Sequence, residues 1–286
     1  MRDVIFLLGM GRSGSSALAR VLSLCGGALP LDVLSPNFAN PTGYWEPAQA
    51  VALNDAFLRE HGSSWYDGSL ALQTGLVGAA ERADFIADIA EFLSSGFEDR
   101  GPIVLKEPRI AALLPYWTAA TAELGLLVKV IQMFREPGEV ADSLAERDGL
   151  SAAHSFALWL KYNLVTERDT RDVRRIFVSY DGLMQDWEIV AALCIAQLEL
   201  DLTIGGETKR AVANFLSPAL RHHRSAATDA HAVGAPLAGW VRRVYGILQE
   251  AEAGRVHTPE LDAIRADYVS SRHAAQYCLV RPVGSR

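Results

Sequence analysis

A glycine-rich segment near the N-terminus carries residue types that suit anion binding. It follows a short apolar run and holds three glycines, one cation and three hydroxyls: Gly9, Gly11, Arg12, Ser13, Gly14, Ser15 and Ser16. Backbone N–H groups in a glycine-rich turn that opens a helix converge on an anion, and the helix dipole adds to the attraction. The guanidinium and the hydroxyls supply further donors. The segment therefore predicts a phosphate-type binding site.

The glycine spacing fits the dinucleotide fingerprint only in part. Gly9, Gly11 and Gly14 stand at the expected positions. That fingerprint also needs an acid at the end of a second strand, about 20 residues further on, to hold a ribose. Asp32 lies at about this distance, but the stretch Gly26–Pro30 leaves little room for a strand before it. A Rossmann oxidoreductase is therefore a disfavoured alternative.

The same glycines also fit the frame of a nucleoside triphosphate loop. Gly9 and Gly14 enclose four residues, as in that loop, but Ser15 stands where the lysine should be. This lysine clamps the outer phosphates, so its absence disfavours ordinary ATP or GTP hydrolysis. Arg12 moves the cation three residues earlier. A P-loop kinase remains open as an alternative enzyme.

A second candidate anion site lies near the middle of the chain. Arg135 follows an apolar run, Pro137 opens a predicted helix, and Ser143 lies on that helix. A guanidinium fork together with a hydroxyl can hold a terminal phosphate. The sequence predicts that Arg135 and Ser143 form such a site.

Alternating strands and helices must position these residues. Apolar runs rich in β-branched residues predict buried parallel strands at Val4–Leu8, Ile103–Leu105, Leu127–Met133 and Arg175–Ser179. Helical spacing predicts helices at Ser15–Cys25, Ala48–His61, Glu81–Leu93, Ile110–Leu124, Pro137–Arg147, Ala152–Arg168 and Leu183–Leu200. We expect one α/β domain over residues 1–286, with a central parallel sheet flanked by helices (core about 1–200) and a helical C-terminal cap (about 201–286). Two long loops, about Gly26–Pro47 and Ser217–Gly239, suit a functional role.

Composition narrows the class of protein. The chain has 286 residues, of which 50% are hydrophobic and 21% charged, and its formal net charge is -7. These values argue against disorder and against a general nucleic-acid binder. The three cysteines lie far apart, and no apolar run is long enough for a secretory signal or a membrane span. We expect a cytoplasmic protein with reduced thiols, no structural metal and no membrane span.

Several motifs in order resemble the PAPS-dependent sulfotransferases. The Arg-Ser-Gly-Ser-Ser loop resembles the family's 5′-phosphosulfate loop, and Arg135 with Ser143 resembles its 3′-phosphate motif. Further similar pieces are YWEP at Tyr44–Pro47, LKEPR at Leu105–Arg109 and VSYDGL at Val178–Leu183. The resemblance covers roughly residues 4–190 and is nearest to the diverse bacterial members, because Arg12 stands where the phenol type has lysine. It implies a three-layer P-loop-like fold and a P-loop-like sulfotransferase.

The resemblance also implies a reaction and a set of site residues. PAPS would donate a sulfuryl group to a hydroxyl or amine, leaving adenosine 3′,5′-bisphosphate, with no metal. Cofactor-binding residues would be Gly11, Arg12, Ser13, Gly14, Ser15, Ser16, Arg135, Ser143, Arg221 and Arg224. Catalytic residues would be Glu46 as general base, with Arg12 and Lys106 as cations.

Three matters stay open at the level of sequence. Glu107, His61 and His154 are alternative bases. The acceptor is a small molecule, a glycan or a lipid. A non-catalytic nucleotide-binding protein is the alternative from a different functional class.

Overall fold

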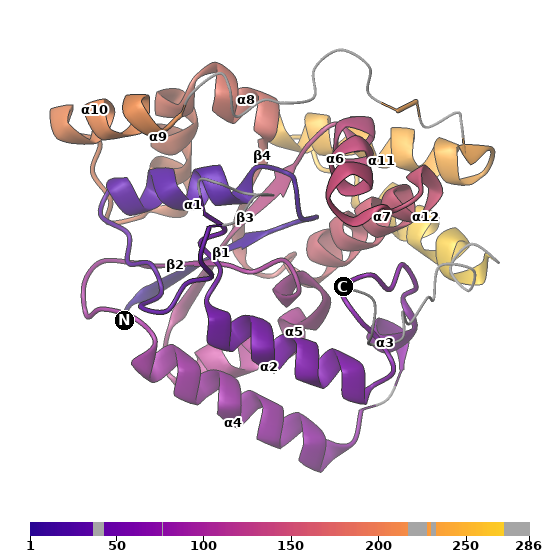
Figure 1. The fold of residues 1–286 in the computed structure, drawn as a ribbon, viewed down its shortest axis with the longest axis horizontal. Coiled ribbons are helices and arrows are strands. Elements are labelled where there is room, and N and C mark those ends of the chain that lie inside the picture. Colours follow the sequence, from indigo (N-terminus) through magenta and orange to yellow (C-terminus); the bar gives the residue numbers. More distant parts are fainter. Residues whose placement is uncertain (37–42, 76, 217–227, 230–232, 272–286) are drawn as a thin grey trace.

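The computed structural model describes residues 1–36, 43–75, 77–216, 228–229 and 233–271. Within them, parallel strands form one sheet in the order β2-β1-β3-β4. Their bounds are β1 Asp3–Leu8, β2 Ile103–Lys106, β3 Leu127–Phe134 and β4 Arg174–Ser179. Each predicted strand is confirmed to within one residue, and the predicted parallel sheet flanked by helices is confirmed as well (Figure 1).

The helices fill both faces of this sheet. They are α1 Ser15–Leu24, α2 Ala48–Glu60, α3 Ala71–Thr74, α4 Ala79–Ser95, α5 Ile110–Glu123, α6 Pro137–Asp148, α7 Ala152–Asp169, α8 Tyr180–Gln185, α9 Trp187–Leu198, α10 Gly206–Phe215, α11 Leu237–Glu252 and α12 Thr258–Ser270. After residue 201 the described elements are all helices, as expected for the C-terminal cap.

Two apolar cores, one on each face, explain the layering. Alternate strand residues point to opposite faces of a sheet, so Ile5 and Leu7 join the core under α1, α9 and α10, whereas Phe6 and Leu8 join the other core. That second core is larger and takes side chains from α2, α4, α5, α6, α7, α11 and α12. In Figure 1, α1, α9 and α10 lie above the sheet and α2 and α4 below it. Both faces are therefore buried, which accounts for the continuous apolar runs of the strands.

One predicted helix is wrong in its length. The apolar spacing of Leu183–Leu200 predicts a single helix, but the structure has α8 and α9 with Asp186 between them. Asp186 is extended, with φ -152° and ψ 86°, and its side chain accepts a hydrogen bond from the N–H of Ile189 at 3.1 Å. An aspartate at this position satisfies an orphan donor of the new helix. Local capping thus outweighs the continuous apolar pattern.

A buried carboxylate joins the C-terminal cap to the core. Glu167 on α7 is 1% exposed and accepts hydrogen bonds from Arg171 at 2.6 Å and from Arg175 at 3.0 Å. Arg171 also binds Asp262 on α12 at 2.9 Å. The ion pairs therefore fix α12 against α7.

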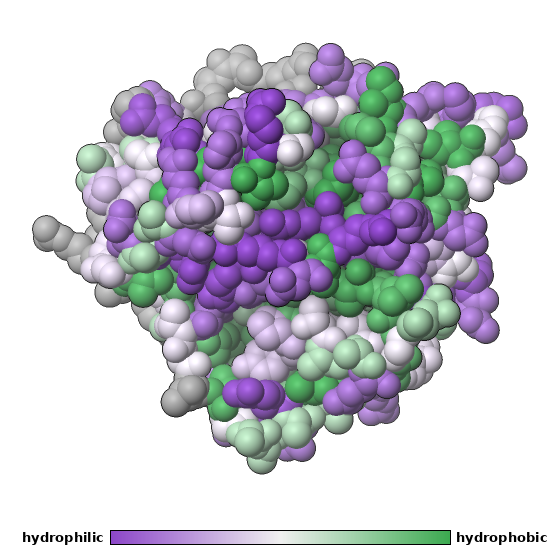
Figure 2. All heavy atoms as spheres, turned by 180° about the vertical axis from the view of Figure 1, so that it is seen from behind, coloured by the Kyte–Doolittle hydropathy of each residue, from purple (hydrophilic) through white to green (hydrophobic). Residues whose placement is uncertain are grey.

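The outer surface is mixed in character. Figure 2, seen from behind Figure 1, shows a band of hydrophilic residues across the middle of that face, with apolar residues above and below it. None of the helices in the described part of the chain combines the length and the apolar character that a membrane crossing needs.

Candidate functional site

The carboxyl ends of the strands bring the predicted site residues to one edge of the sheet. In the register of the sheet, Leu7 of β1 lies opposite Lys106 of β2, and Leu8 lies opposite Gln132 of β3. Phe134 of β3 lies opposite Ser179 of β4. The glycine-rich loop, Lys106, Arg135 and Tyr180 therefore start from neighbouring strand ends, the edge where ligands of parallel sheets bind.

The glycine-rich loop follows a path that requires glycine at two positions. Gly9 has φ 122° and Gly14 has φ 88°. A methyl group added at Gly9 would overlap the carbonyl oxygen of Met133, and one at Gly14 would overlap the ring of Tyr180. Arg12 also has a positive φ, of 71°. A non-glycine residue in this region costs about 1–3 kcal/mol, and such strain is concentrated at functional sites.

Several donors of the loop remain available to an anion. Gly14 is the N-cap residue of α1, and no side chain among the described residues caps this helix. Ser13 is fully buried, and its Oγ has no hydrogen-bond partner in the described part of the chain. Ser15 is buried as well. A buried hydroxyl without a partner calls for an explanation, and a bound anion would supply one.

Ser16 has a different role from the other serines. Its hydroxyl donates a hydrogen bond to the carbonyl oxygen of Tyr44 at 3.2 Å. This bond ties the glycine-rich loop to the long loop that precedes α2. The same long loop is closed by a hydrogen bond from Leu34 N–H to the carbonyl oxygen of Glu46 at 2.8 Å. The two bonds fix the backbone on both sides of Glu46.

The two anion sites predicted from sequence meet in space. Arg12 donates a hydrogen bond from Nε to the Oγ of Ser143 at 2.8 Å, although the two residues are 131 positions apart. Nη1 of Arg135 lies 3.4 Å from the carbonyl oxygen of Arg12. Ser143 is thus hydrogen-bonded to Arg12 of the glycine-rich loop rather than to Arg135. The structure therefore brings the two predicted anion-binding segments into direct contact.

Arg135 is held on several sides. Its Nε donates to Oε2 of Glu139 at 2.6 Å, and its guanidinium carbon lies 4.5 Å from the ring centre of Tyr180. Its carbonyl oxygen accepts from Nε1 of Trp159 at 3.0 Å. Its Nη2 is buried and has no partner among the described residues. The arrangement leaves Nη2 of a fixed guanidinium for a ligand.

Arg12 is largely buried and has two other guanidinium groups nearby. Burial, followed by the nearby guanidinium of Arg147, lowers the pKa of Arg12. Arg135 adds to the same effect, whereas Tyr44 and Asp148 oppose it. Because burial is the main cause, the protonated form is disfavoured here, and a bound anion would stabilise it.

A buried ion pair connects the long loop to β2. Lys106 Nζ donates to Oε1 of Glu46, and the two side chains are 5% and 10% exposed. Glu46 lies just before Pro47, the N-cap residue of α2, but its side chain turns to the strand end rather than serving as a helix cap. The structure thus brings together the predicted base and the predicted second cation.

Glu107, the alternative base, is fully enclosed. Its carboxylate accepts from Asn54 Nδ2 and from Arg109 Nη1, each at 2.5 Å, and its exposure is 0%. Arg109 also donates from Nε to Asp55 at 2.5 Å. Burial raises the pKa of Glu107, with Arg109 opposing and the neighbouring Glu46 adding to the shift. Because both of its oxygens are engaged, Glu107 suits a structural role.

The two candidate histidines are also engaged. His61 Nδ1 lies 2.8 Å from the carbonyl oxygen of Phe57, and Nε2 lies 3.5 Å from Glu81. His154 Nε2 lies 2.6 Å from the carbonyl oxygen of Tyr66. These contacts fit packing roles at the C-terminal end of α2 and on α7.

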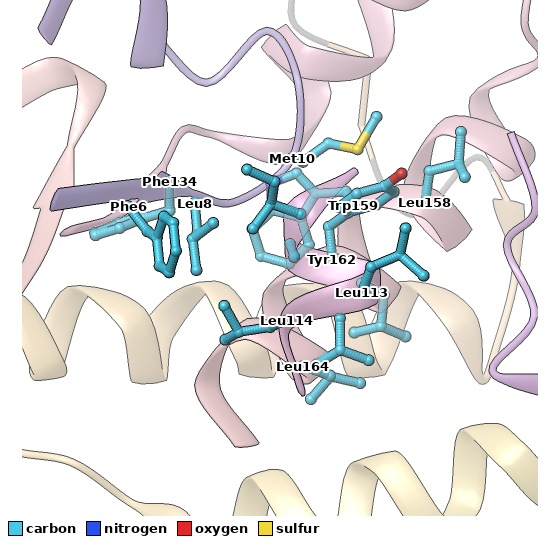
Figure 3. Close-up of a cluster of buried hydrophobic side chains, with 14 of the residues drawn as sticks. Phe6, Leu8, Met10, Leu113, Leu114, Phe134, Leu158, Trp159, Tyr162 and Leu164 are labelled. Atoms are coloured by element: carbon cyan, nitrogen blue, oxygen red, sulfur yellow. The ribbon is translucent and has the colours of Figure 1, made fainter. Parts of the chain in front are cut away.

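Apolar side chains support the site from below. Met10, within the glycine-rich loop, is 2% exposed and belongs to the larger core. Figure 3 shows it gathered with Trp159 and Tyr162, which reach it from α7. The loop is therefore anchored by its own side chain, while its polar groups remain at the edge of the sheet.

The residues predicted from sequence and the residues found around the site do not coincide fully. Arg221 and Arg224 lie outside the described residues. Glu139 was missed, although it stands four positions after Arg135, a spacing at which residues of a helix interact. Asn54 and Asp55 carry no sequence signal, because they act only through Glu107 and Arg109.

The chain is similar in structure to several known proteins. No protein-family model matches the chain, and no curated protein matches it significantly. A sulfotransferase domain from the curacin biosynthetic pathway is similar in structure, with a TM-score of 0.50 and 17% identity over 87% of this chain and 98% of that domain. Two weaker similarities are to the sulfotransferase domain of the Synechococcus PCC 7002 olefin synthase (TM-score 0.45, 18% identity, 95% of this chain and 97% of that one) and to sulfotransferase STF1 of Mycobacterium tuberculosis H37Rv (TM-score 0.41, 17% identity, 89% and 77%).

At such low sequence identity, the structural similarity supports a shared fold and nothing more specific. The similarity covers most of this chain and almost all of the curacin domain. The family resemblance predicted from the motifs is confirmed at this level: the chain has the fold of the sulfotransferases.

Proposed function

We propose that the chain is a sulfotransferase that uses PAPS as donor. The sulfuryl group would pass to a hydroxyl or amine of a small-molecule, carbohydrate or lipid acceptor by in-line displacement. One observation carries the proposal: the hydrogen bond from Arg12 to Ser143, which unites the phosphosulfate-type loop and the 3′-phosphate-type motif in a single site. A donor whose ribose carries phosphate groups at both the 3′ and the 5′ position needs such a double site.

The donor is assigned to these residues by their chemistry. The loop from Gly11 to Ser16 and the N-terminus of α1 would hold the 5′-phosphosulfate, with Arg12 as its cation. Arg135 and Ser143 would hold the 3′-phosphate through the unpartnered Nη2 and the hydroxyl. We further assign Arg221 and Arg224, which lie outside the described residues, to the donor.

Glu46 and Lys106 are assigned to the transfer step. The acceptor oxygen attacks sulfur, its proton passes to the Glu46 carboxylate, and the bond from sulfur to the bridging phosphate oxygen breaks. Lys106 would neutralise charge on the sulfuryl oxygens as this bond breaks. The assignment is supported by the direct contact between the two residues and by the engagement of both oxygens of Glu107.

The alternatives have less support. The dinucleotide interpretation needs an acid that ends the second strand, but β2 begins only at Ile103 and Asp32 is exposed in a bend after α1. A kinase would lack the loop lysine that clamps the outer phosphates. A non-catalytic nucleotide-binding protein would have no need of a buried Glu46–Lys106 pair at the same edge.

Calorimetry with four nucleotides tests the donor. We expect adenosine 3′,5′-bisphosphate to bind more tightly than AMP, ADP and NAD, and Arg135→Ala to remove most of the preference over AMP. Tighter binding of NAD or ADP than of the bisphosphate would rule out a PAPS enzyme.

Slow transfer to water tests the reaction without a known acceptor. Release of the bisphosphate from PAPS should be catalysed by the wild type and reduced about a hundredfold in Glu46→Gln, the scale of general-base catalysis. Tight binding without any turnover, with water or with a panel of hydroxylated acceptors, would favour the non-catalytic alternative.

A further inference from the structure

A carboxylate lies inside the candidate anion site. Glu139 is 7% exposed, and its Oε2 accepts the hydrogen bond from Nε of Arg135 at 2.6 Å. A negative charge next to a phosphate-binding arginine opposes the binding of phosphate, because like charges repel strongly in a partly buried environment. Its presence therefore needs a reason beyond ligand recognition.

The need of Arg135 for a counter-charge before the donor binds supplies this reason. Arg135 is 8% exposed, and one face of its guanidinium is covered by the ring of Tyr180. A buried charge without a counter-charge costs several kcal/mol. When no ligand is present, Glu139 is the acid that pairs with Arg135 among the described residues. It therefore keeps the guanidinium in place before the donor arrives.

The ligand would meet the same guanidinium through another nitrogen. Glu139 uses the Nε–H, whereas Nη2 is buried and has no partner in the described part of the chain. Ser143 lies one helical turn after Glu139, and residues at this spacing share a face of a helix. A 3′-phosphate bound by Nη2 and Ser143 would thus share one guanidinium with the Glu139 carboxylate.

We propose that Glu139 is a positioning residue that stabilises Arg135 before the donor binds. By the same charge it weakens binding of the 3′-phosphate and speeds release of the bisphosphate product. The inference rests on the proposed donor. It states that the carboxylate lowers affinity, which is the opposite of what a purely structural partner of Arg135 would do.

Glu139→Gln tests the sign of this effect. The amide oxygen can still accept the Nε–H, but the negative charge is gone. Titration calorimetry and stopped-flow displacement with adenosine 3′,5′-bisphosphate should show about tenfold tighter binding and correspondingly slower dissociation. Binding of AMP, which lacks the 3′-phosphate, should change less than twofold. Without ligand the variant should melt at a lower temperature than the wild type, yet gain more from saturating bisphosphate.

A matched control and a second variant keep the outcome clear. Glu123→Gln removes one exposed negative charge at the end of α5 and should change none of these values. Glu139→Asp keeps the charge but withdraws it by one methylene, so it should tighten the bisphosphate by a smaller factor than the amide does.

The results separate this inference from the proposed function. If the wild type binds the bisphosphate and the folded Glu139 variants bind it equally or more weakly, the inference is wrong and the proposed function stands. If neither the wild type nor the variants prefer the bisphosphate to AMP, the donor assignment is wrong, and the inference fails with it.

Discussion

Breaking the buried pair between Lys106 and Glu46 should destabilise the protein strongly. Lys106→Met leaves the Glu46 carboxylate without its cation, at a position close to the buried carboxylate of Glu107. Glu46→Gln leaves the ammonium group of Lys106 without its anion. The double variant removes both charges and keeps side chains of similar size.

The burial of the two side chains sets the magnitude. They are 5% and 10% exposed, so water screens the pair little. At an effective dielectric constant of 20, two unit charges about 4 Å apart attract by about 4 kcal/mol. Removal of one partner of a buried pair typically costs 3–5 kcal/mol, whereas replacement of both is often nearly neutral. We expect each single variant to lose about 3 kcal/mol of unfolding free energy and the double variant about 2 kcal/mol.

Urea denaturation of the four proteins, followed by tryptophan fluorescence at pH 7, measures the coupling between the residues. The expected values give a coupling energy of about 4 kcal/mol. The chain offers a matched control in the ion pair of Lys209 and Glu188, whose side chains are 51% and 42% exposed. The same substitutions there should show a coupling below about 1 kcal/mol.

A small coupling would refute this reasoning. If Lys106→Met and Glu46→Gln each cost no more than their exposed counterparts, the two charges must be solvated in the folded protein. Their assignment as a preformed catalytic pair would then lose its structural basis.

Three further predictions concern the loop, the cap and the thiols. Gly9→Ala should lower the free energy of unfolding, measured by urea denaturation, by more than about 3 kcal/mol, because the added methyl group meets a backbone oxygen. Gly62→Ala, at φ 65° with open space around it, should lower it by about 1 kcal/mol. Equal losses would contradict the overlap at Gly9. Glu167→Gln should lose about 3 kcal/mol, because this carboxylate is 1% exposed and pairs with both Arg171 and Arg175. A loss below about 1 kcal/mol would show that these two ion pairs contribute little. Burial raises the pKa of Cys25 to about 11 and that of Cys194 to about 12. Mass spectrometry should therefore show both thiols unmodified by a thiol reagent at pH 8 in the native protein and modified in urea. Rapid modification of the native protein would contradict their burial.

The strands were predicted well from sequence because each strand depends on the hydrophobic character of consecutive residues. Each strand is a continuous apolar run that both faces of the sheet bury, and no other part of the fold competes for it. The break at Asp186 was missed because a side-chain cap there competes with the helical pattern on a scale of one residue. Periodicity averages over several residues and does not detect such a competition.

The candidate site was predictable only in its parts. The glycine-rich loop could be predicted from sequence because its backbone path excludes side chains at Gly9 and Gly14. Arg135 is recognisable because it follows a strand. The different surroundings of Glu46 and Glu107 were not predictable, because the contacts of Asn54 and Arg109 with Glu107 arise only in the folded chain.

The sequence by itself determined the order of strands and helices, the glycine-rich turn and the cations that follow the strand ends. These features depend on backbone sterics and on the burial of neighbouring side chains. The tertiary structure alone decided that Arg12 meets Ser143 across 131 positions and that Glu46 meets Lys106 across 60. Charge pairing acts through space and has no characteristic spacing along the chain, so only the packed sheet with its parallel strand ends could bring these groups together.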